Sequence, residues 1–204
     1  MYWHKNNFLV KKLYPSFLWN KPTHTKEIYL TFDDGPIPEV TEWVLEQLAA
    51  YQAKATFFCV GDNIRKHPFV FTKVKQGGHS IGNHTYNHLN GWKTPVSDYF
   101  TNVQACQQVA GIPVHLFRPP YGKITRKQAA HIQQTHQIVM WDVLSGDFDQ
   151  QLPAQVCLRK SIQHTENGSI VVFHDSIKAW KNLKEVLPAY LAHFSALGYT
   201  FQSL

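Results

Sequence analysis

The amino-acid sequence predicts an α/β domain in which parallel strands form a compact, incomplete barrel. The chain has 204 residues, a length that suits a single domain with one buried core. Short runs rich in β-branched and aromatic residues alternate with longer segments of helical periodicity, which is the pattern of βα units around a parallel sheet. Seven strand-like runs are recognisable, one fewer than a full eight-fold barrel requires. Catalytic groups in such folds lie on the loops that follow the strands.

Each expected element rests on local sequence. The strands are predicted from short apolar runs at residues 28–32, 55–60, 79–82, 116–118, 138–141, 170–173 and 199–201. The helices are predicted between them, at residues 39–51, 62–76, 96–110, 125–135, 153–163 and 182–197. Val40, Val44 and Leu48 show the helical spacing in the first of these. Pro153 suits a first helical turn, and Gly111 suits a helix end.

The charge and organisation of the chain narrow the classes of function. A formal net charge of +6 could attract nucleic acid, but Lys and Arg are scattered and no recognition motif accompanies them. We therefore interpret the charge as a solvated surface and expect no nucleic-acid partner. No repeat or linker divides the chain. We expect residues 1–25 to form an N-terminal extension that packs on a catalytic domain formed by residues 26–204.

The N-terminal region contains apolar residues between Phe8 and Trp19. Lys11, Lys12 and Pro15 interrupt them, so the longest apolar run is too short for the core of a signal peptide. No other run approaches the length of a membrane span. The sequence thus predicts a cytoplasmic protein, with peripheral association at the cell envelope as the alternative.

The three cysteines, Cys59, Cys106 and Cys157, lie far apart and form no C-x-x-C pair. This spacing is not typical of a disulfide framework or a structural zinc site. We expect three free thiols.

Two adjacent acids, Asp33 and Asp34, directly follow the first predicted strand and precede Gly35 and Pro36. Acids before Gly-Pro can simply form a turn. Two carboxylates at the carboxyl end of a strand can also divide the work of a hydrolase, since one can bind a cation while the other acts as general base.

Two histidines, His84 and His88, are spaced four residues apart. On one turn of a helix they would share a face and could hold one metal ion, although surface histidines are the simpler interpretation. With Asp34 they make a two-histidine, one-carboxylate set that leaves a coordination position for water. Such a set is typical of catalytic zinc, and iron, cobalt and nickel accept the same ligands.

Two further segments carry reactive side chains. Arg118 and Tyr121 belong to an Arg-Pro-Pro-Tyr-Gly loop that follows a strand. The loop can be a rigid connection, or Arg118 can pair with a buried carboxylate while backbone N–H groups near Tyr121 face an oxyanion. His174 ends a continuous apolar strand, where it can be a core histidine or a general acid.

Taken in order, these segments resemble the polysaccharide deacetylase family, the carbohydrate esterases with the NodB-type homology domain. The resemblance runs from about residue 28 to the C-terminus and implies a distorted seven-stranded (β/α) barrel. It also implies hydrolysis of N-acetyl groups on a chitin-like or peptidoglycan-like oligomer or polymer, with Zn²⁺ as the expected metal and Co²⁺ or Ni²⁺ as alternatives. The roles implied by the resemblance are a base (Asp33) with its partner (Arg118), metal ligands (Asp34, His84, His88), an acid (His174) with its partner (Asp147), an oxyanion contact (Tyr121) and an acetyl-pocket wall (Val172).

Three positions depart from the family's pattern. Leu144 replaces an acid, Phe148 replaces the usual Trp after Asp147, and Val172 replaces a more common Leu. All three concern the acetyl pocket, so they affect the expected substrate preference and leave the metal and proton-transfer groups in place. The alternatives that remain are an O-acetyl carbohydrate esterase with the same site and a non-catalytic glycan-binding domain.

Overall fold

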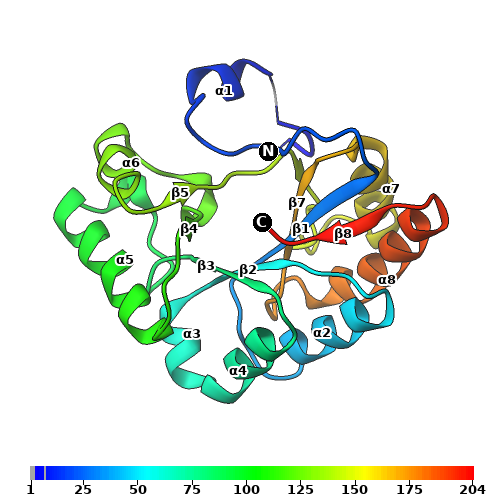
Figure 1. Ribbon diagram of the computed structural model, residues 1–204, viewed down its shortest axis with the longest axis horizontal. Coiled ribbons are helices and arrows are strands. Elements are labelled where there is room, and N and C mark those ends of the chain that lie inside the picture. Colours follow the sequence, from blue (N-terminus) through cyan, green and yellow to red (C-terminus); the bar gives the residue numbers. More distant parts are fainter. Residues whose placement is uncertain (1–2, 7) are drawn as a thin grey trace.

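A computed structural model describes residues 3–6 and 8–204 of the chain and shows one curled, parallel β-sheet with helices on its outer side (Figure 1). The strands run in the order β5-β4-β3-β2-β1-β7-β6, and the short β8 pairs with the first residues of β1. Their bounds are β1 Glu27–Asp33, β2 Thr56–Cys59, β3 Ser80–Asn83, β4 Leu116–Phe117, β5 Gln137–Ile138, β6 Val143–Leu144, β7 Ile170–His174 and β8 Thr200–Gln202. The predicted incomplete barrel is confirmed.

One strand was absent from the sequence prediction. The segment predicted as a single strand at residues 138–141 corresponds to β5, and a separate strand, β6, follows it. Both contain two residues, and β6 joins the other end of the sheet by pairing with β7. Two-residue strands carry no readable alternation, so the sequence could not separate them.

The long helices surround the sheet (Figure 1). Their bounds are α2 Val40–Ala50, α5 Val96–Ala110, α6 Arg126–Ile132, α7 Ala154–His164 and α8 Trp180–Ala196. Gly111 ends α5 with a φ of 64°, as predicted, and Pro153 caps α7 one residue before the helix rather than lying in its first turn. The single helix predicted at residues 62–76 is wrong. It is divided into α3 Gly61–Lys66 and α4 Pro68–Gln76, because Pro68 forces the preceding residue out of the helical region.

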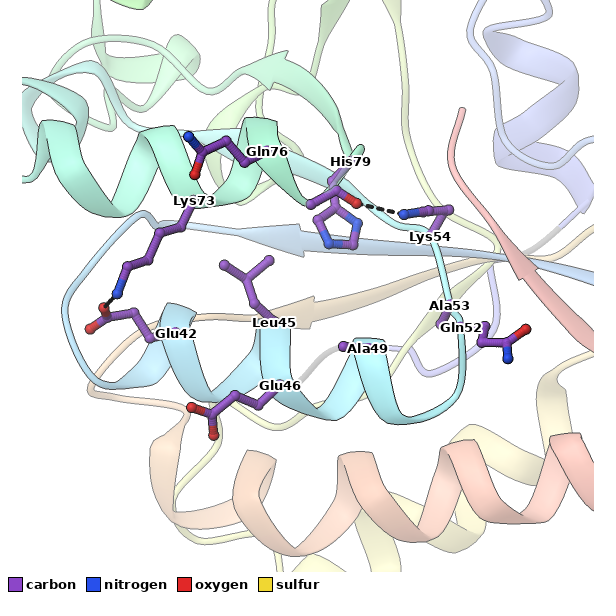
Figure 2. A pocket seen from close by; sticks show the side chains of 11 residues that line it. Glu42, Leu45, Glu46, Ala49, Gln52, Ala53, Lys54, Lys73, Gln76 and His79 are labelled. Atoms are coloured by element: carbon purple, nitrogen blue, oxygen red, sulfur yellow. Dashed lines mark hydrogen bonds and ion pairs between the residues drawn. The ribbon is translucent and has the colours of Figure 1, made fainter.

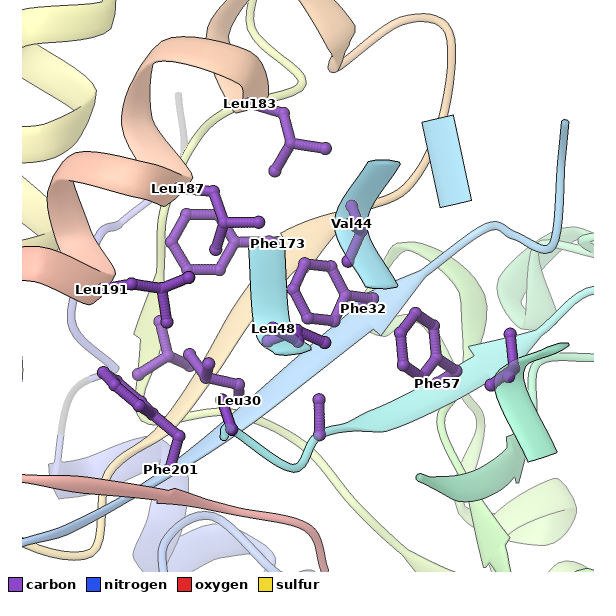
Figure 3. Packing of buried hydrophobic residues seen from close by; sticks show 14 of the residues in the cluster. Leu30, Phe32, Val44, Leu48, Phe57, Phe173, Leu183, Leu187, Leu191 and Phe201 are labelled. Atoms are coloured by element: carbon purple, nitrogen blue, oxygen red, sulfur yellow. The ribbon is translucent and has the colours of Figure 1, made fainter. Parts of the chain in front are cut away.

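The core lies between the outer face of the sheet and the helices (Figure 3). Leu30 and Phe32 of β1 are fully buried at its centre, with Phe173 of β7 beside Phe32 at a ring distance of 6.0 Å. Leu48 of α2 and Leu187 of α8 close the layer from outside. Because β1 is packed on both sides, the residues at its carboxyl end are held in fixed positions.

The N-terminal region fills the gap between the two ends of the sheet. Leu18 forms a bridge with Val139 beyond β5, and Lys5 forms a bridge with Val143 of β6. In Figure 1 the short helix α1 (Phe8–Leu13) lies over this opening. Phe17 and Trp19 are buried in a cluster with residues of α5 and α6, whereas Phe8, Leu9 and Leu13 of α1 are exposed. The domain boundary at residue 25 stays a prediction.

A buried acid anchors this region. Asp142 is 1% exposed, and its two carboxylate oxygens accept hydrogen bonds of 2.6 Å from Lys5 and Lys11. Ser169 donates a third hydrogen bond to the same carboxylate. Burial would raise the pKa of Asp142, but the hydrogen bonds of Lys11, Lys5 and Ser169 together outweigh it and lower the pKa.

Two properties of the described chain bear on the earlier expectations. Across residues 3–6 and 8–204, no helix combines the length and apolar character needed to cross a membrane. The three cysteines are buried and carry free thiols in the structure.

Candidate active site

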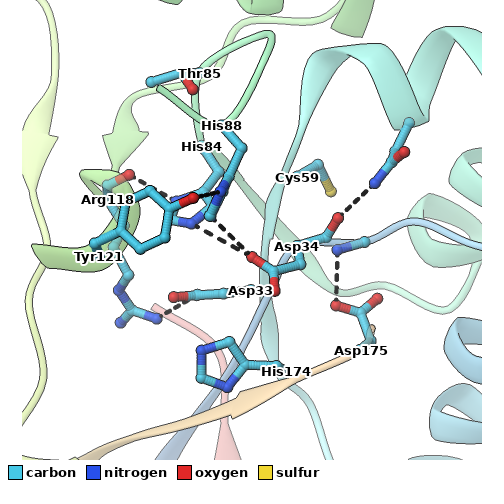
Figure 4. A network of polar contacts seen from close by, with 12 residues as sticks. Asp33, Asp34, Cys59, His84, Thr85, His88, Arg118, Tyr121, His174 and Asp175 are labelled. Carbon is cyan, nitrogen blue, oxygen red and sulfur yellow. Dashed lines mark hydrogen bonds and ion pairs between the residues drawn. The ribbon is translucent and has the colours of Figure 1, made fainter. Parts of the chain in front are cut away.

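The candidate site lies where β1, β3 and β7 end. Asp33 is the last residue of β1 and Asp34 follows it, His84 follows β3, and His174 is the last residue of β7. Figure 4 shows these side chains converging from their separate strands. The register of the sheet places Asp33 beside His174, so residues 141 positions apart in sequence share one site.

Asp34, His84 and His88 form a cluster that can hold a metal ion. One ligand atom of each lies within 4.8 Å of the others. The Nε2 atoms of His84 and His88 lie 3.8 Å and 3.1 Å from Oδ1 of Asp34. Two imidazole nitrogens and one carboxylate oxygen are a donor set that fits Zn²⁺, Co²⁺ or Ni²⁺. The sequence prediction of this cluster agrees with the geometry.

The protonation of the cluster also suits a cation. Burial lowers the pKa of His84 to about 4, so its imidazole is neutral at pH 7. Nδ1 of His84 hydrogen-bonds the Arg118 carbonyl at 2.7 Å, which makes Nδ1 the donor and leaves Nε2 free to bind a metal. Burial alone would raise the pKa of Asp34, but the hydrogen bond with His88 and the nearby imidazoles lower it.

The predicted helical turn that carries the two histidines is wrong. They lie on a loop after β3 in which Thr85 and His88 have φ angles of 62° and 56°. Asn83 stabilises this loop by accepting a hydrogen bond of 2.9 Å from the Thr85 N–H. The Thr85 hydroxyl in turn accepts one from the Leu89 N–H. The two rings therefore meet because the loop turns back on itself, not because of helical periodicity.

Tyr121 contacts His88 in a way that the sequence did not predict. Its hydroxyl lies 3.0 Å from Nδ1 of His88, and the two rings are 4.6 Å apart. This contact orients the imidazole with Nε2 toward Asp34. Tyr121 has a φ of 61°, an unusual conformation for a large side chain, and Gly122 after it has a φ of 66°.

Arg118 and Asp33 form a buried ion pair, as predicted. Arg118 is fully buried, and its Nη1 donates a hydrogen bond of 2.7 Å to Asp33. The remaining guanidinium donors bond Thr31 and the carbonyls of Val139 and Met140. Because these partners lie on β1 and directly after β5, the guanidinium is held in place and orients the Asp33 carboxylate.

His174 and Asp147 form the second pair. One carboxylate oxygen of Asp147 lies 2.8 Å from Nδ1 of His174, and the other accepts the His174 backbone N–H at 2.7 Å. Burial would lower the pKa of His174, but the charge and hydrogen bond of Asp147 outweigh it and raise the pKa to about 9. The imidazole is therefore protonated at neutral pH in the metal-free site.

Asp175 supports the turn that follows Asp34, a role that the sequence did not reveal. Its carboxylate accepts hydrogen bonds from the Gly35 N–H at 3.0 Å and the Thr41 hydroxyl at 2.6 Å. Gly35 is required there, because a Cβ atom would lie 1.9 Å from the carboxylate. Asn63 holds the other side of the turn by donating to the Asp34 carbonyl at 2.7 Å.

The cluster and both pairs surround a cavity of about 510 Å³. Its wall includes the predicted pocket residues Tyr121, Phe148 and Val172, together with Leu144. The remaining residues of its lining are Asp33, Asp34, His84, His88, Gly122, Lys123, Trp141, Lys178 and His174. Trp141 and the two lysines were not foreseen, since the loops after β4, β5 and β7 bring them together only in the folded chain.

A second cavity, of about 620 Å³, lies between α2 and α4 (Figure 2). Its described lining contains Glu42, Glu46, Lys54, Lys73 and His79, and Lys73 pairs with Glu42. None of the residues around the Asp34 cluster contributes to it. The Asp34 cluster and the two buried pairs thus lie only at the cavity at the strand ends, among these two cavities.

A parallel α/β sheet with an Asp-His-His cluster at its strand ends, flanked by a paired carboxylate and a paired imidazole, has the make-up of a metal-dependent hydrolase. The family model described as polysaccharide deacetylase matches residues 20–139, and the chain belongs to this family. The resemblance inferred from the motifs is thereby confirmed.

Similar proteins agree with this assignment. A peptidoglycan-N-acetylglucosamine deacetylase of Bacillus cereus is 32% identical over 206 residues, which cover 95% of this chain and 94% of that protein. A second Bacillus cereus protein of the same name is 32% identical over 166 residues, and there the match spans 79% of this chain and 60% of the relative. A crystal structure of the Bc1960 peptidoglycan N-acetylglucosamine deacetylase, in complex with a substituted N-oxidanyl-benzamide, has a TM-score of 0.84 at 29% identity. That match covers 93% of this chain and 91% of the other.

Proposed function

We propose that this chain removes the N-acetyl group from N-acetylglucosamine-type residues of a poly- or oligosaccharide and releases acetate. The observation that carries the proposal is the presence of a paired base and a paired acid beside one metal-binding cluster. Asp33 is paired with Arg118, His174 is paired with Asp147, and both line the cavity that contains the cluster. A domain that only bound glycans would have no use for this combination.

The metal site contributes the electrophilic part of the chemistry. Asp34, His84 and His88 would hold a divalent cation, for which Zn²⁺ is the expected ion. When bound, such a cation polarises the acetamide carbonyl and makes a water molecule more acidic. The protein's own contribution is to hold the three ligands in place through the hydrogen bonds of His84 and His88 to the Arg118 carbonyl and the Tyr121 hydroxyl.

Asp33 acts as the general base. Its carboxylate accepts the proton of the attacking water as the C–O bond forms, which leaves a tetrahedral carbon with a negatively charged oxygen. Arg118 pairs with Asp33 and holds its carboxylate in place until that moment. The backbone N–H of Tyr121 is proposed to stabilise the oxyanion, in the role that the family resemblance implies.

His174 acts as the general acid. Its protonated imidazole donates a proton to the sugar nitrogen as the C–N bond breaks, so that a neutral amine departs rather than an amide anion. Asp147 binds Nδ1 and thereby directs Nε2 toward the cavity. Over the reaction Asp33 gains one proton and His174 loses one, so the protons balance. The products are acetate and a free amino sugar.

The acetyl group is proposed to sit against the apolar part of the cavity. Val172 and Leu144 are neighbours in the register of β7 and β6, and both line the cavity. Phe148 packs edge-on against His174 at a ring distance of 5.1 Å. A methyl group is accommodated here, whereas a charged acyl group would lose its hydration without a partner.

Acetate release tests the proposal directly. Purified protein loaded with Zn²⁺, Co²⁺ or Ni²⁺ is assayed on N-acetylglucosamine oligomers, peptidoglycan and O-acetylated xylan, with metal content measured on the same samples. Release from the N-acetylated glycans supports the proposal. Release from the xylan alone would favour an O-acetyl esterase, and binding without release by the loaded protein would indicate a glycan-binding domain.

A further inference from the structure

Two lysines belong to the catalytic cavity, although nothing in the proposed reaction uses them. Lys123 lies on the loop after β4, and Lys178 lies on the loop after β7. These two strands are separated by β3, β2 and β1 in the sheet order, so the lysines approach the cavity from different arms of the curled sheet.

Each lysine is placed by an aromatic ring. The Lys123 ammonium lies 5.2 Å from the centre of the Trp92 ring, and the Lys178 ammonium lies 5.6 Å from the centre of the Phe148 ring. Both distances are within the range of cation–π attraction. Trp92 is itself held beside Lys123, because its indole N–H donates to the Ile124 carbonyl at 3.3 Å. These aromatic contacts hold the two flexible lysine side chains at the cavity.

The other charges of the cavity are already paired. Arg118 neutralises Asp33, Asp147 neutralises His174, and Asp34 belongs to the cluster that would hold a cation. Among the described residues that line the cavity, Lys123 and Lys178 are therefore the charged groups that remain for a ligand. A divalent cation would add further positive charge. A neutral N-acetylglucosamine oligomer carries no charged group that could pair with the two lysines.

We propose that Lys123 and Lys178 bind carboxylates of a negatively charged glycan on either side of the sugar that is deacetylated. The inference rests on the proposed function and specifies its substrate class. The shared chemistry is a carboxylate next to an N-acetylglucosamine residue. It is available in strands that alternate N-acetylglucosamine with N-acetylmuramic acid, either on the lactyl ether or on an attached stem peptide. Neutral chitin-type oligomers lack it.

The test compares acetate release from three glycans of similar length. They are a neutral N-acetylglucosamine oligomer, an alternating strand without stem peptides, and the same strand with stem peptides. Lys123→Gln, Lys178→Gln and the double variant are compared with Lys184→Gln, which removes an exposed lysine of α8 away from the cavity. The measured quantity is the ratio of kcat/KM on each anionic strand to kcat/KM on the neutral oligomer.

We expect each cavity variant to lower this ratio roughly fivefold, because one pair of unit charges about 4 Å apart in water corresponds to that factor. The change should appear mainly in KM, and added salt should lower the wild-type ratio in the same direction. A lower ratio for the peptide-free strand identifies the lactyl carboxylate as the group that the lysines bind. A lower ratio for the peptide-bearing strand alone identifies a carboxylate of the stem peptide. An unchanged ratio in the double variant, or an equal fall in Lys184→Gln, overturns the inference.

The proposed function can fail separately. If no glycan yields acetate with the loaded wild-type protein, calorimetric binding of the same three glycans to Asp33→Asn, with and without the lysine substitutions, still measures the preference. Selective loss of affinity for the anionic strands would support the lysine inference in that case, and equal affinity for all three glycans would contradict it.

Discussion

Replacement of Arg118 by Met would show how strongly the site depends on its buried cation. Methionine occupies a similar volume but donates no hydrogen bond. The change removes the 2.7 Å bonds to Asp33 and Thr31 and the bonds to two carbonyls. Asp33, which is 4% exposed, would be left without its counter-charge. Removal of one partner from a buried ion pair costs roughly 3–5 kcal/mol, a large part of the 5–15 kcal/mol that stabilises a typical domain.

Urea unfolding and kinetics on a double-mutant cycle measure this dependence. We expect Arg118→Met to lower the free energy of unfolding by roughly 3–5 kcal/mol. Asp33→Asn in the same background should restore about 0.5–3 kcal/mol, because it removes the uncompensated charge. Activity should fall by roughly 10²–10⁴-fold in Arg118→Met, since the Asp33 carboxylate loses the hydrogen bond that orients it as a base. Additive free energies, or a rate of Arg118→Met within tenfold of wild type, would refute the reasoning.

Three further predictions concern the neighbouring residues. Asp34→Asn should lower metal content and activity together, whereas Asp33→Asn should keep its metal and lose roughly 10²–10⁴-fold in rate. Metal analysis that found an empty site in Asp33→Asn and a full one in Asp34→Asn would exchange the two roles. Asp147→Asn should move the alkaline limb of the pH–rate profile to lower pH, because Asp147 holds the pKa of His174 at about 9. The His174 pKa is raised from 6.5, so the stability contributed by the His174–Asp147 pair is complete below pH 6.5 and is lost as the pH rises through about 9. Unfolding of wild type and Asp147→Asn at several pH values measures the direction of this change. Gly35→Ala should lower the free energy of unfolding by roughly 1–3 kcal/mol and reduce metal affinity, because the alanine Cβ would overlap Asp175. A variant as stable as wild type would contradict this contact.

The sequence predicted the fold through features that act locally. Continuous apolar runs predicted the long strands β1 and β7, and Gly111 predicted the end of α5. Prediction failed where local signals compete or are too short. Pro68 interrupts a run whose apolar spacing alone reads as one helix, and β6 contains only two residues. The strand β6 is defined by its pairing with β7, which no local pattern reports.

The candidate site could be predicted as far as its motifs extend. Asp34, His84 and His88 were foreseen as one cluster, but the helical turn assigned to the histidines was wrong, because Asn83 and Thr85 stabilise a loop instead. The contact of Tyr121 with His88 depends on a left-handed conformation that the sequence of a tyrosine does not indicate. The supporting carboxylate of Asp175 was missed for a related reason. It serves a turn about 140 residues away, and only the register of β1 with β7 brings the two together.

The bridging of the sheet by the N-terminal region has a consequence for the order of events during synthesis. Lys5, Leu18 and Asn20 are synthesised long before their bridge partners Val143, Val139 and Ser169. Until then Phe17 and Trp19 have no core to enter, because the α5 and α6 residues that bury them are also unmade. The nascent chain therefore carries Phe17 and Trp19 without these core partners until residues 99–140 have been made. Contacts of such long sequence separation form late, so docking of this region is expected to be the step that completes folding.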